Sequence, residues 1–283
     1  MSEAPRPLAG RICLVAGASR GLGRGIAQAL GEAGATVIVT GRSSEAGPHT
    51  DQRPETFEDT ARAVEAAGGK GHPYRCDHTS ERDVDMLVAW ALRRFGRLDC
   101  VVDAVWGGNE GYDGRLYSDG SAFGAPFWRR PVARLGQGFE SGVYAQLLLA
   151  RAVAPAMVQA RRGLFVTISF DTGAGYLGDV FYDLAKAAMN RLTLAMGHEL
   201  APFGVTALGL SPGHVLTERV AEAGLAEQTT ETPAYAGRCV AALLGDEAVG
   251  RYGGQTLAVA DLARIYGFTD RDGRQPGRFT IPQ

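Results

Sequence analysis

Short apolar runs alternate with segments of helical spacing along almost the whole chain, and this alternation limits the folds open to it. Strands are expected at 11–16, 36–40, 71–75, 98–105, 164–169, 205–210 and 255–259, and helices at 22–32, 55–67, 81–95, 135–161, 182–202, 216–225 and 233–244. A helix between two strands carries the chain back to begin the next strand in the same direction. The pattern therefore predicts an α/β protein with a doubly wound parallel sheet of about seven strands and helices on both faces.

The chain of 283 residues shows no internal repeat, low-complexity stretch or linker, which predicts a single domain over 1–283. Two segments do not follow the alternation of strand and helix. The glycine-rich stretch 106–131 has little apolar periodicity and is expected to form a long irregular insertion. The tail 261–283 is polar and glycine-rich, and it is expected to pack on the domain or on a neighbouring subunit.

The net charge of −2 and the isoelectric point near 6.2 give no indication of a nucleic-acid partner or of an anionic membrane surface. The most apolar long stretch, 143–158, is interrupted by Gln146, Arg151 and Pro155, which predicts a buried amphipathic helix rather than a membrane span.

Residues 1–9 lack the apolar core of a signal peptide. No histidine or cysteine spacing suggests a metal site, and the scattered cysteines favour a reducing cytoplasm: Cys13, Cys76, Cys100 and Cys239.

A glycine-rich turn joins the first expected strand to the first expected helix. In such a turn the backbone N–H groups can approach a pyrophosphate, and the N-terminus of the following helix favours its negative charge. Glycine-rich turns are common, but the position between a strand and a helix is the context that a dinucleotide site requires. The sequence predicts a Rossmann-type nucleotide site formed by Gly17, Ser19, Arg20, Gly21, Leu22 and Gly23.

The end of the second expected strand carries Arg42 where an acidic residue would hold the ribose hydroxyls of NAD. Arg20 in the glycine turn adds a second cation, and two guanidinium groups suit a 2′-phosphate, so NADP(H) is the expected cofactor. Arg42 could instead be a solvated loop arginine. Asp77, after the third expected strand, could accept a hydrogen bond from the adenine amino group or cap the turn before Ser80.

Tyr182 and Lys186 lie four residues apart in an expected helix, so their side chains share one face. An ammonium beside a phenol favours the phenolate, and we expect the pKa of Tyr182 to fall. A tyrosine whose pKa lies nearer neutrality can exchange a proton with an alcohol or a carbonyl. The same spacing is common on ordinary helix surfaces, so the pair gains its weight from the nucleotide site.

Taken together and in this order, the motifs resemble the short-chain dehydrogenase/reductase family over residues 11–259. Segment 211–217, Ser-Pro-Gly-His-Val-Leu-Thr, resembles the family's Pro-Gly-x-x-x-Thr loop, which contacts the nicotinamide carboxamide and phosphates. The insertion and the tail resemble the subgroup typified by dehydrogenase/reductase member 1.

The resemblance implies hydride transfer from a nicotinamide. Tyr182 would be the general acid or base, Lys186 would lower its pKa and bind the ribose, and Ser169 would bind the substrate oxygen. It also implies cofactor contacts from Asp77, His78, Ala104, Val105, Pro212, Gly213, Val215 and Thr217.

Two positions depart from the family's pattern around the lysine. The run 103–106, Asp-Ala-Val-Trp, stands in place of Asn-Asn-Ala-Gly, so that a large side chain, Trp106, is expected at the mouth of the pocket. Trp106 could stack on a substrate or pack under the insertion. The helix asparagine that supports a water relay to the lysine is absent, and Glu140 or Ser141 is nearest to its place.

The serine position is ambiguous. Ser169 lies 13 positions before Tyr182, the common spacing in the family, whereas alignment of the strand puts Phe170 at the usual serine. Because strand side chains alternate between faces, a slip of one residue would point Ser169 away from the site. We expect Ser169 to be catalytic, with Asp171 or Thr172 as alternative polar groups.

The first functional hypothesis is an NADP(H)-dependent oxidoreductase that interconverts a carbonyl and an alcohol. The second keeps the cofactor but performs an elimination, isomerisation or cyclisation in secondary metabolism, and the third is a nucleotide-binding regulator without catalysis.

The aromatic side chains of the insertion favour an aromatic or polycyclic substrate, although they could be loop core or subunit contacts. A homodimer or homotetramer is expected through 135–161 and the helix of Tyr182. Substrate contacts are expected from Trp106, Phe170, Asp171, Tyr176 and His214.

Overall fold

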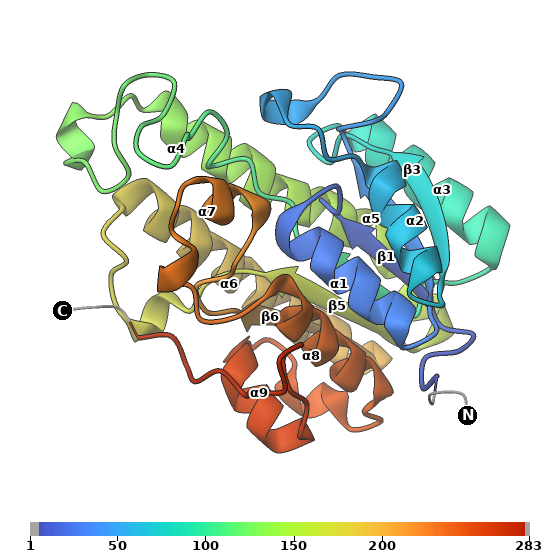
Figure 1. The fold of residues 1–283 in the computed structure, drawn as a ribbon. Coiled ribbons are helices and arrows are strands. Elements are labelled where there is room, and N and C mark those ends of the chain that lie inside the picture. The colour runs from blue at the N-terminus through green and yellow to red at the C-terminus, as the bar shows by residue number, and fades with distance from the viewer. Residues whose placement is uncertain (1–5, 281–283) are drawn as a thin grey trace.

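The computed structural model describes residues 6–280, which form a seven-stranded parallel sheet covered by helices on both faces (Figure 1). The expected doubly wound Rossmann-type sheet is confirmed, with the strand order β3-β2-β1-β4-β5-β6-β7. The order changes direction between β1 and β4, and ligands of such sheets bind at the carboxyl ends of strands near this point. The strands are β1 (Ile12–Ala16), β2 (Thr36–Gly41), β3 (Lys70–Arg75), β4 (Cys100–Asp103), β5 (Gly163–Ile168), β6 (Val205–Ser211) and β7 (Thr256–Ala258).

Side chains of the central strands alternate between two buried layers. Cys13 and Val15 of β1 belong to one layer, and Leu14 belongs to the other. The first layer lies under α1 (Gly21–Glu32), α2 (Phe57–Ala66), α8 (Pro233–Gly245) and α9 (Val259–Tyr266), and the second under α3 (Glu81–Phe95), α5 (Ala145–Ala160) and α6 (Val180–Leu200). Strands buried on both faces read as continuous apolar runs, which is why the sequence reveals them.

Side-chain caps fix where two of the site's helices begin. The hydroxyl of Ser80 accepts from the backbone N–H of Asp83 at the start of α3, as the sequence predicts. At the start of α6, the carboxylate of Asp179 accepts from the N–H of Tyr182 at 2.9 Å. This cap places Tyr182 in the first turn of α6, close to the carboxyl end of β5.

The helix expected at 135–161 is divided into three parts. It consists of α4 (Ala133–Gly138), a π-helical turn (Phe139–Tyr144) and α5. Turns of this kind are frequent at functional sites. The whole run is long and apolar enough to span a membrane by length and composition, but its inner side packs on α3, β5 and α6 as a core helix does.

The first part of the tail differs from the polar segment that the sequence predicts. Residues 259–266 form α9, whose Leu262 and Ala263 are buried in the core. Residues 269–270 pack on the same chain, because Arg238 of α8 donates to the carbonyl oxygens of Thr269 and Asp270 at 2.8 and 2.9 Å.

Candidate active site

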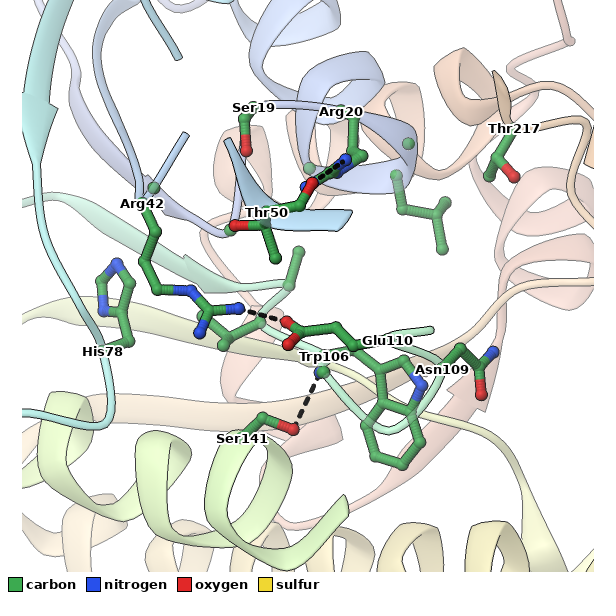
Figure 2. Close-up of a pocket in the computed structure, with 18 of the residues that line it drawn as sticks. Ser19, Arg20, Arg42, Thr50, His78, Trp106, Asn109, Glu110, Ser141 and Thr217 are labelled. Carbon is green, nitrogen blue, oxygen red and sulfur yellow. Dashed lines mark hydrogen bonds and ion pairs between the residues drawn. The ribbon is translucent and has the colours of Figure 1, made fainter. Parts of the chain in front are cut away.

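A pocket of about 310 Å³ opens at the carboxyl ends of β1, β2 and β4 (Figure 2). Most residues that the sequence predicts as cofactor contacts line it: Gly17, Ser19, Arg20, Gly21, Leu22, Gly23, Arg42, Asp77, His78, Ala104, Val105 and Thr217. The pocket extends to Trp106. The side chains of Tyr182 and Lys186 lie outside its wall, as do Pro212, Gly213 and Val215.

The turn between β1 and α1 is shaped for the close approach of phosphates. Gly17 has a φ of +70°, and a β-carbon there would lie 2.8 Å from the carbonyl oxygen of Ala104. A β-carbon at Gly23 would lie 2.3 Å from the carbonyl oxygen of Gly17. Only glycine fits at both positions, so the turn can bring the N-terminus of α1 against a pyrophosphate. These residues therefore fit a dinucleotide.

A carboxylate of the chain itself lies at this helix N-terminus. The backbone N–H of Gly21 donates to Oε2 of Glu218 at 2.8 Å. Glu218 begins the short helix α7 (Glu218–Glu222), which follows Thr217. Its carboxylate satisfies the donor that a phosphate would use. Sequence reasoning missed Glu218, because its position depends on how the loop after β6 folds over α1.

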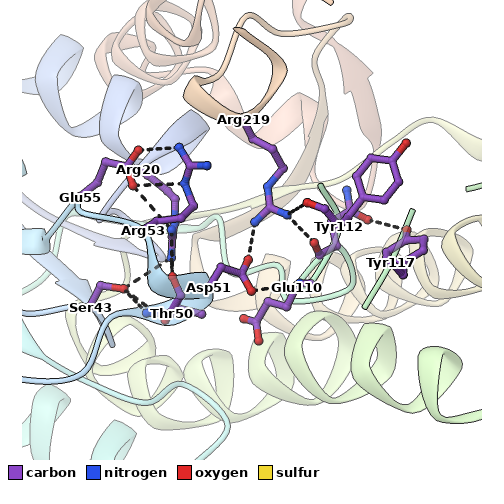
Figure 3. Close-up of polar contacts among 12 residues, drawn as sticks. Arg20, Ser43, Thr50, Asp51, Arg53, Glu55, Glu110, Tyr112, Tyr117 and Arg219 are labelled. Atoms are coloured by element: carbon purple, nitrogen blue, oxygen red, sulfur yellow. Dashed lines mark hydrogen bonds and ion pairs between the residues drawn. The ribbon is translucent and has the colours of Figure 1, made fainter. Parts of the chain in front are cut away.

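Each arginine predicted at the 2′-phosphate also has a carboxylate partner. Arg42 lies in the pocket wall and forms an ion pair with Glu110 of the insertion (Figure 2). Arg20 donates to the carbonyl oxygen of Thr50 at 3.2 Å and lies 3.7 Å from the carboxylate of Glu55 (Figure 3). Arg42 is thus paired at the pocket wall, although about 40% of its side chain is exposed. No sequence signal pairs it with Glu110, since that distance depends on the path of the insertion.

Three segments that are distant in sequence meet beside the pocket (Figure 3). Arg219 of α7 forms an ion pair with Asp51 and donates to the carbonyl oxygens of Asn109 and Tyr112 at 2.6 and 2.9 Å. The N–H of Gly111 donates to Oδ1 of Asp51 at 3.0 Å. The insertion is therefore attached to both the loop after β2 and the loop after β6.

Replacing Glu110 with glutamine is expected to strengthen the binding of a dinucleotide that carries a 2′-phosphate, because the carboxylate that competes for Arg42 is removed. An ion pair with this exposure contributes about 0.2–1 kcal/mol, so the dissociation constant should fall about 1.5- to 5-fold. Isothermal titration calorimetry measures the change. Glu199→Gln, an exposed substitution near the far end of α6, is the matched control. Weaker binding, or the same change in the control, would contradict the competition.

The two residues after β3 are used within the chain. Oδ1 of Asp77 accepts from the N–H and hydroxyl of Thr79 at 3.0 and 2.7 Å. Nε2 of His78 lies 2.8 Å from the hydroxyl of Thr40, and burial lowers the pKa of His78 to about 4, so the ring is neutral. The structure supports the turn-capping role of Asp77, and both residues still border the pocket.

Tyr182 and Lys186 share one face of α6, as their spacing predicts. Nζ of the buried Lys186 lies 5.7 Å from the centre of the Tyr182 ring and 4.0 Å from the centre of the Trp106 ring. It also lies 3.5 Å from the carbonyl oxygen of Ile168. Burial lowers the pKa of Lys186 to about 7, although the carboxylate of Asp103 opposes this. The charge of this lysine therefore changes close to neutral pH.

The expected fall in the pKa of Tyr182 is wrong for this structure. Desolvation raises the pKa of the phenol, and the carboxylates of Asp179 and Asp183 add to the rise. Lys186 does not reverse the effect, because burial removes part of its own charge near neutrality. The phenol is protonated at neutral pH, which suits the donation of a proton.

Asp103 is a buried acid at the end of β4 to which sequence reasoning gave no role. Its Oδ1 accepts from the N–H of Val105 at 3.1 Å, and its Oδ2 has no hydrogen-bond partner within residues 6–280. Burial raises the pKa of Asp103 to about 7, and the charge of Lys186 acts in the opposite direction. The replacement of the family's asparagine by aspartate was the only signal.

Trp106 separates the pocket from Tyr182. The two rings meet edge to face, with their centres 5.4 Å apart. Of the two alternatives for Trp106, the structure supports packing, and the side chain still borders the pocket (Figure 2). The nucleotide pocket and the Tyr182–Lys186 pair are therefore adjacent but divided by this one ring.

Neither residue expected to replace the family asparagine contacts Lys186. Glu140 is exposed, and no ion pair within the described part of the chain joins it to Lys186. The hydroxyl of Ser141 accepts from the N–H of Gly107 at 2.8 Å and donates to the carbonyl oxygen of Gln137 at 2.6 Å. The ring of Trp106 instead lies 4.0 Å from Nζ of Lys186, and a part for either residue in a water relay stays a prediction.

Phe170 approaches Tyr182, with the two ring centres 6.2 Å apart. Ser169 is buried, and its hydroxyl has no hydrogen-bond partner among residues 6–280. Its N–H donates to the carbonyl oxygen of Leu210 at 2.8 Å, which continues the pairing of β5 with β6. The role of Ser169 at a substrate oxygen stays a prediction.

Other residues predicted on the substrate side lie beside the C-terminal segment. Asp171 forms an ion pair with Arg278, and the ring centres of His214 and Phe279 are 6.4 Å apart. Tyr176 is more than half exposed. Residues 278–279 therefore lie beside two of the residues predicted to contact the substrate.

Three members of the Pro-Gly loop lie away from the nucleotide pocket. Pro212 and Gly213 line a separate cavity of about 20 Å³, together with Phe170. Val215 is buried and pairs with Glu231 in a short parallel bridge. Thr217 is the loop residue that borders the pocket.

Two of the six aromatic side chains of the insertion, Tyr112 and Tyr117, pack on each other within it. The rings of Tyr112 and Tyr117 pack with their centres 4.8 Å apart, and the guanidinium of Arg134 lies 3.9 Å from the centre of the Tyr117 ring. Phe123 approaches Tyr182, at 6.1 Å between ring centres, whereas Phe127 and Trp128 are exposed. Of the expected apolar pocket, only Trp106 and Phe123 reach Tyr182 from the insertion.

Residues 11–228 match a family described as short chain dehydrogenase. The chain is 35% identical to dehydrogenase/reductase SDR family member 1 of Mus musculus, over 95% of this chain and 85% of that protein. It is 27% identical to 7alpha-hydroxysteroid dehydrogenase of Escherichia coli (strain K12), over 75% and 73%. A solved hydroxysteroid dehydrogenase from Escherichia coli is similar in structure, with a TM-score of 0.71, 25% identity and coverage of 89% and 95%. The chain therefore belongs to the short-chain dehydrogenase family, whose members are oxidoreductases that use a nicotinamide cofactor to interconvert alcohols and carbonyls.

Proposed function

We propose that this protein is an NADP(H)-dependent oxidoreductase that interconverts a carbonyl and an alcohol, with Tyr182 as the proton donor or acceptor. One observation carries the proposal. The pocket formed by the glycine turn and Arg42 ends at Trp106, and Trp106 packs directly on Tyr182 and Lys186. A protein that only binds a nucleotide does not need a phenol and an ammonium at the end of its pocket.

The residues of the pocket would divide the work of binding NADP(H). The N–H of Gly21 would donate to the pyrophosphate in place of Glu218, and Arg42 would bind the 2′-phosphate in place of Glu110. The hydride for carbonyl reduction comes from the nicotinamide.

Tyr182 would give a proton to the oxygen of the reduced carbonyl. Burial supports this role, because it keeps the phenol protonated at neutral pH. The ammonium of Lys186 would stabilise the phenolate that remains after donation. That positive charge is fully present below the pKa of Lys186, about 7, and is lost as the pH rises through it.

The experiment that tests the proposal is turnover of carbonyl compounds. Purified protein is mixed with NADPH and a panel of ketones, aldehydes and quinones, and oxidation of the cofactor is followed by absorbance. We expect at least one compound to be reduced to its alcohol, with one NADPH oxidised for each molecule reduced. Tight NADPH binding without turnover of any carbonyl in a broad panel would overturn the proposal.

Replacing Arg42 with alanine is expected to weaken NADP(H) binding about 10- to 100-fold, because charge-assisted hydrogen bonds contribute about 1.5–3 kcal/mol. Binding of NAD(H), which lacks the 2′-phosphate, should change little. Fluorescence titration with both cofactors measures the difference. Arg264→Ala, an exposed substitution on α9, removes the same charge far from the pocket. Equal affinity of the wild type for both cofactors, unaffected by Arg42→Ala, would rule out the 2′-phosphate assignment.

A second candidate function is favoured by the residue next to Tyr182. Phe170 faces the phenol, and the hydroxyl of Ser169 is buried without a partner in the described chain. A site without a serine hydroxyl would suit elimination, isomerisation or cyclisation with retained cofactor. Product analysis separates the two candidates, since such a reaction consumes no NADPH.

We further propose a homodimer or homotetramer in a reducing cytoplasm. Tyr144 and Leu147 lie exposed where the π-helical turn joins α5, and Leu184 is exposed on the neighbouring α6. Apolar side chains on adjacent helices support an interface between subunits. The four cysteines are free and buried, which suits a reducing compartment.

A further inference from the structure

We propose that Trp106 is a positioning residue that keeps Lys186 in its ammonium form beside Tyr182. This inference rests on the proposed function, because it concerns the same proton-transfer site. The face of an indole carries negative charge density and attracts a cation. Nζ of Lys186 lies 4.0 Å from the centre of the Trp106 ring, closer than the 5.7 Å to the Tyr182 ring.

Glycines on two sides make the space that the indole occupies. A β-carbon at Gly108 would lie 2.5 Å from the ring, and one at Gly142 of the π-helical turn would lie 3.1 Å from it. Gly138 lies on the same side, where a β-carbon would be 3.6 Å from the ring. The N–H of Gly107 donates to Ser141 and ties the start of the insertion to that turn (Figure 2). Packing therefore fixes the ring over Lys186.

Within residues 6–280, no carboxylate forms an ion pair with Lys186. The sheet contributes the carbonyl oxygen of Ile168 at 3.5 Å, and α6 contributes the sulfur of Met189 at 3.7 Å. The π-helical turn places no charge beside Lys186, because its acidic residue, Glu140, is exposed to solvent. Asp103 is the acid that acts on Lys186, and burial raises its own pKa to about 7, so its negative charge is incomplete at neutral pH.

The acidic groups near the phenol of Tyr182 also form no ion pair with Lys186 within the described residues. Asp179 forms a buried ion pair with Arg130. Burial, and after it Asp179, Asp183 and Tyr117, raise the pKa of Tyr182 and oppose its ionisation. A change at Trp106 also removes its direct edge contact with Tyr182, so the titration of Lys186 itself is the measurement that tests the inference.

The composition of the chain allows a direct test. It contains two lysines, Lys70 and Lys186, and Lys70 is exposed. In protein labelled with ¹³C and ¹⁵N on lysine, NMR titration follows Lys186 while Lys70 serves as the internal reference. Trp106→Leu removes the aromatic face, and Trp106→Phe is the matched control because it also shortens the side chain but keeps a face.

We expect the titration midpoint of Lys186 to fall by about one pH unit in Trp106→Leu, the size of a desolvated cation–π contact, and to change little in Trp106→Phe. The pH profile of kcat/KM for the reduced carbonyl should move in the same direction. Equal midpoints in the two variants, or a rise in Trp106→Leu, would overturn the inference. If Trp106→Leu does not fold, Trp106→Met fills more of the space and equally lacks a π-system.

The titration needs no substrate, so the inference and the proposed function fail separately. A wild type that reduces no carbonyl contradicts the proposed function, whatever the midpoints are. If Lys186 titrates at the same pH in Trp106→Leu and Trp106→Phe while the wild type is active, only the role of Trp106 is contradicted.

Discussion

Replacing Tyr182 with phenylalanine is expected to lower kcat about 100- to 10,000-fold, the range for loss of a positioned general acid. The reason is the removal of the proton that the carbonyl oxygen requires as hydride arrives. Affinity for NADP(H) should remain close to that of the wild type, because the side chain of Tyr182 lies outside the wall of the nucleotide pocket. Steady-state kinetics on the best substrate of the panel, with cofactor binding measured in parallel, gives both quantities.

The matched control is Tyr252→Phe, which removes one hydroxyl from a half-buried tyrosine in the turn before β7. Its kcat should equal that of the wild type. Retention of more than a tenth of the wild-type kcat in Tyr182→Phe would show that another group supplies the proton.

Replacing Lys186 with methionine is expected to raise the free energy of unfolding while it lowers kcat at least 100-fold. Burial lowers the pKa of Lys186 from 10.5 to about 7, so folding holds a cation where water is excluded. The full difference corresponds to several kcal/mol, but Asp103 loses its partner in the variant. We expect a net gain of about 1–3 kcal/mol at pH 7, or a rise of about 2–4 °C in Tm for each kcal/mol.

The sign of the pH dependence follows from proton uptake. Between pH 7 and 10.5 the unfolded chain binds a proton at Lys186 that the folded chain does not. The free energy of unfolding of the wild type therefore rises with pH in this window, and the advantage of Lys186→Met is largest near or below pH 7. Denaturant unfolding at a series of pH values measures it. Lys70→Met, on an exposed lysine, should change neither stability nor its pH dependence, and a destabilised Lys186→Met at pH 7 would refute the argument.

The sheet could be predicted from the sequence because its strands are buried on both faces. Residues 205–211 are all buried in β6, and a run of this kind has few alternatives to a central strand. The Ser80 cap and the glycine turn could also be predicted, since each depends on neighbours within a few residues of the sequence. The strand at 98–105 was shorter than expected, because β4 ends at Asp103, whose carboxylate accepts from Val105.

The parts of the site that could not be predicted depend on contacts between distant segments. Glu110 meets Arg42 across 68 positions, and Glu218 meets Gly21 across 197. The pKa of Tyr182 was misjudged because spacing reveals the neighbouring lysine but not the burial of both groups. The helix α9 did carry a signal in the spacing of Val259, Leu262 and Ala263, which the polar residues around them concealed.

The carboxylates of Glu110 and Glu218 have a consequence for how the pocket handles charge. A phosphate bound beside Arg42 or Gly21, as we propose, would replace an anion that the protein already holds there. Binding would then be an exchange of one anion for another, and the electrostatic potential of the pocket would change less than the charge of the dinucleotide suggests. The measured affinity is a difference between two sets of polar contacts. When the cofactor leaves, the N–H of Gly21 and the guanidinium of Arg42 can bind the carboxylates of Glu218 and Glu110 again, instead of facing water alone.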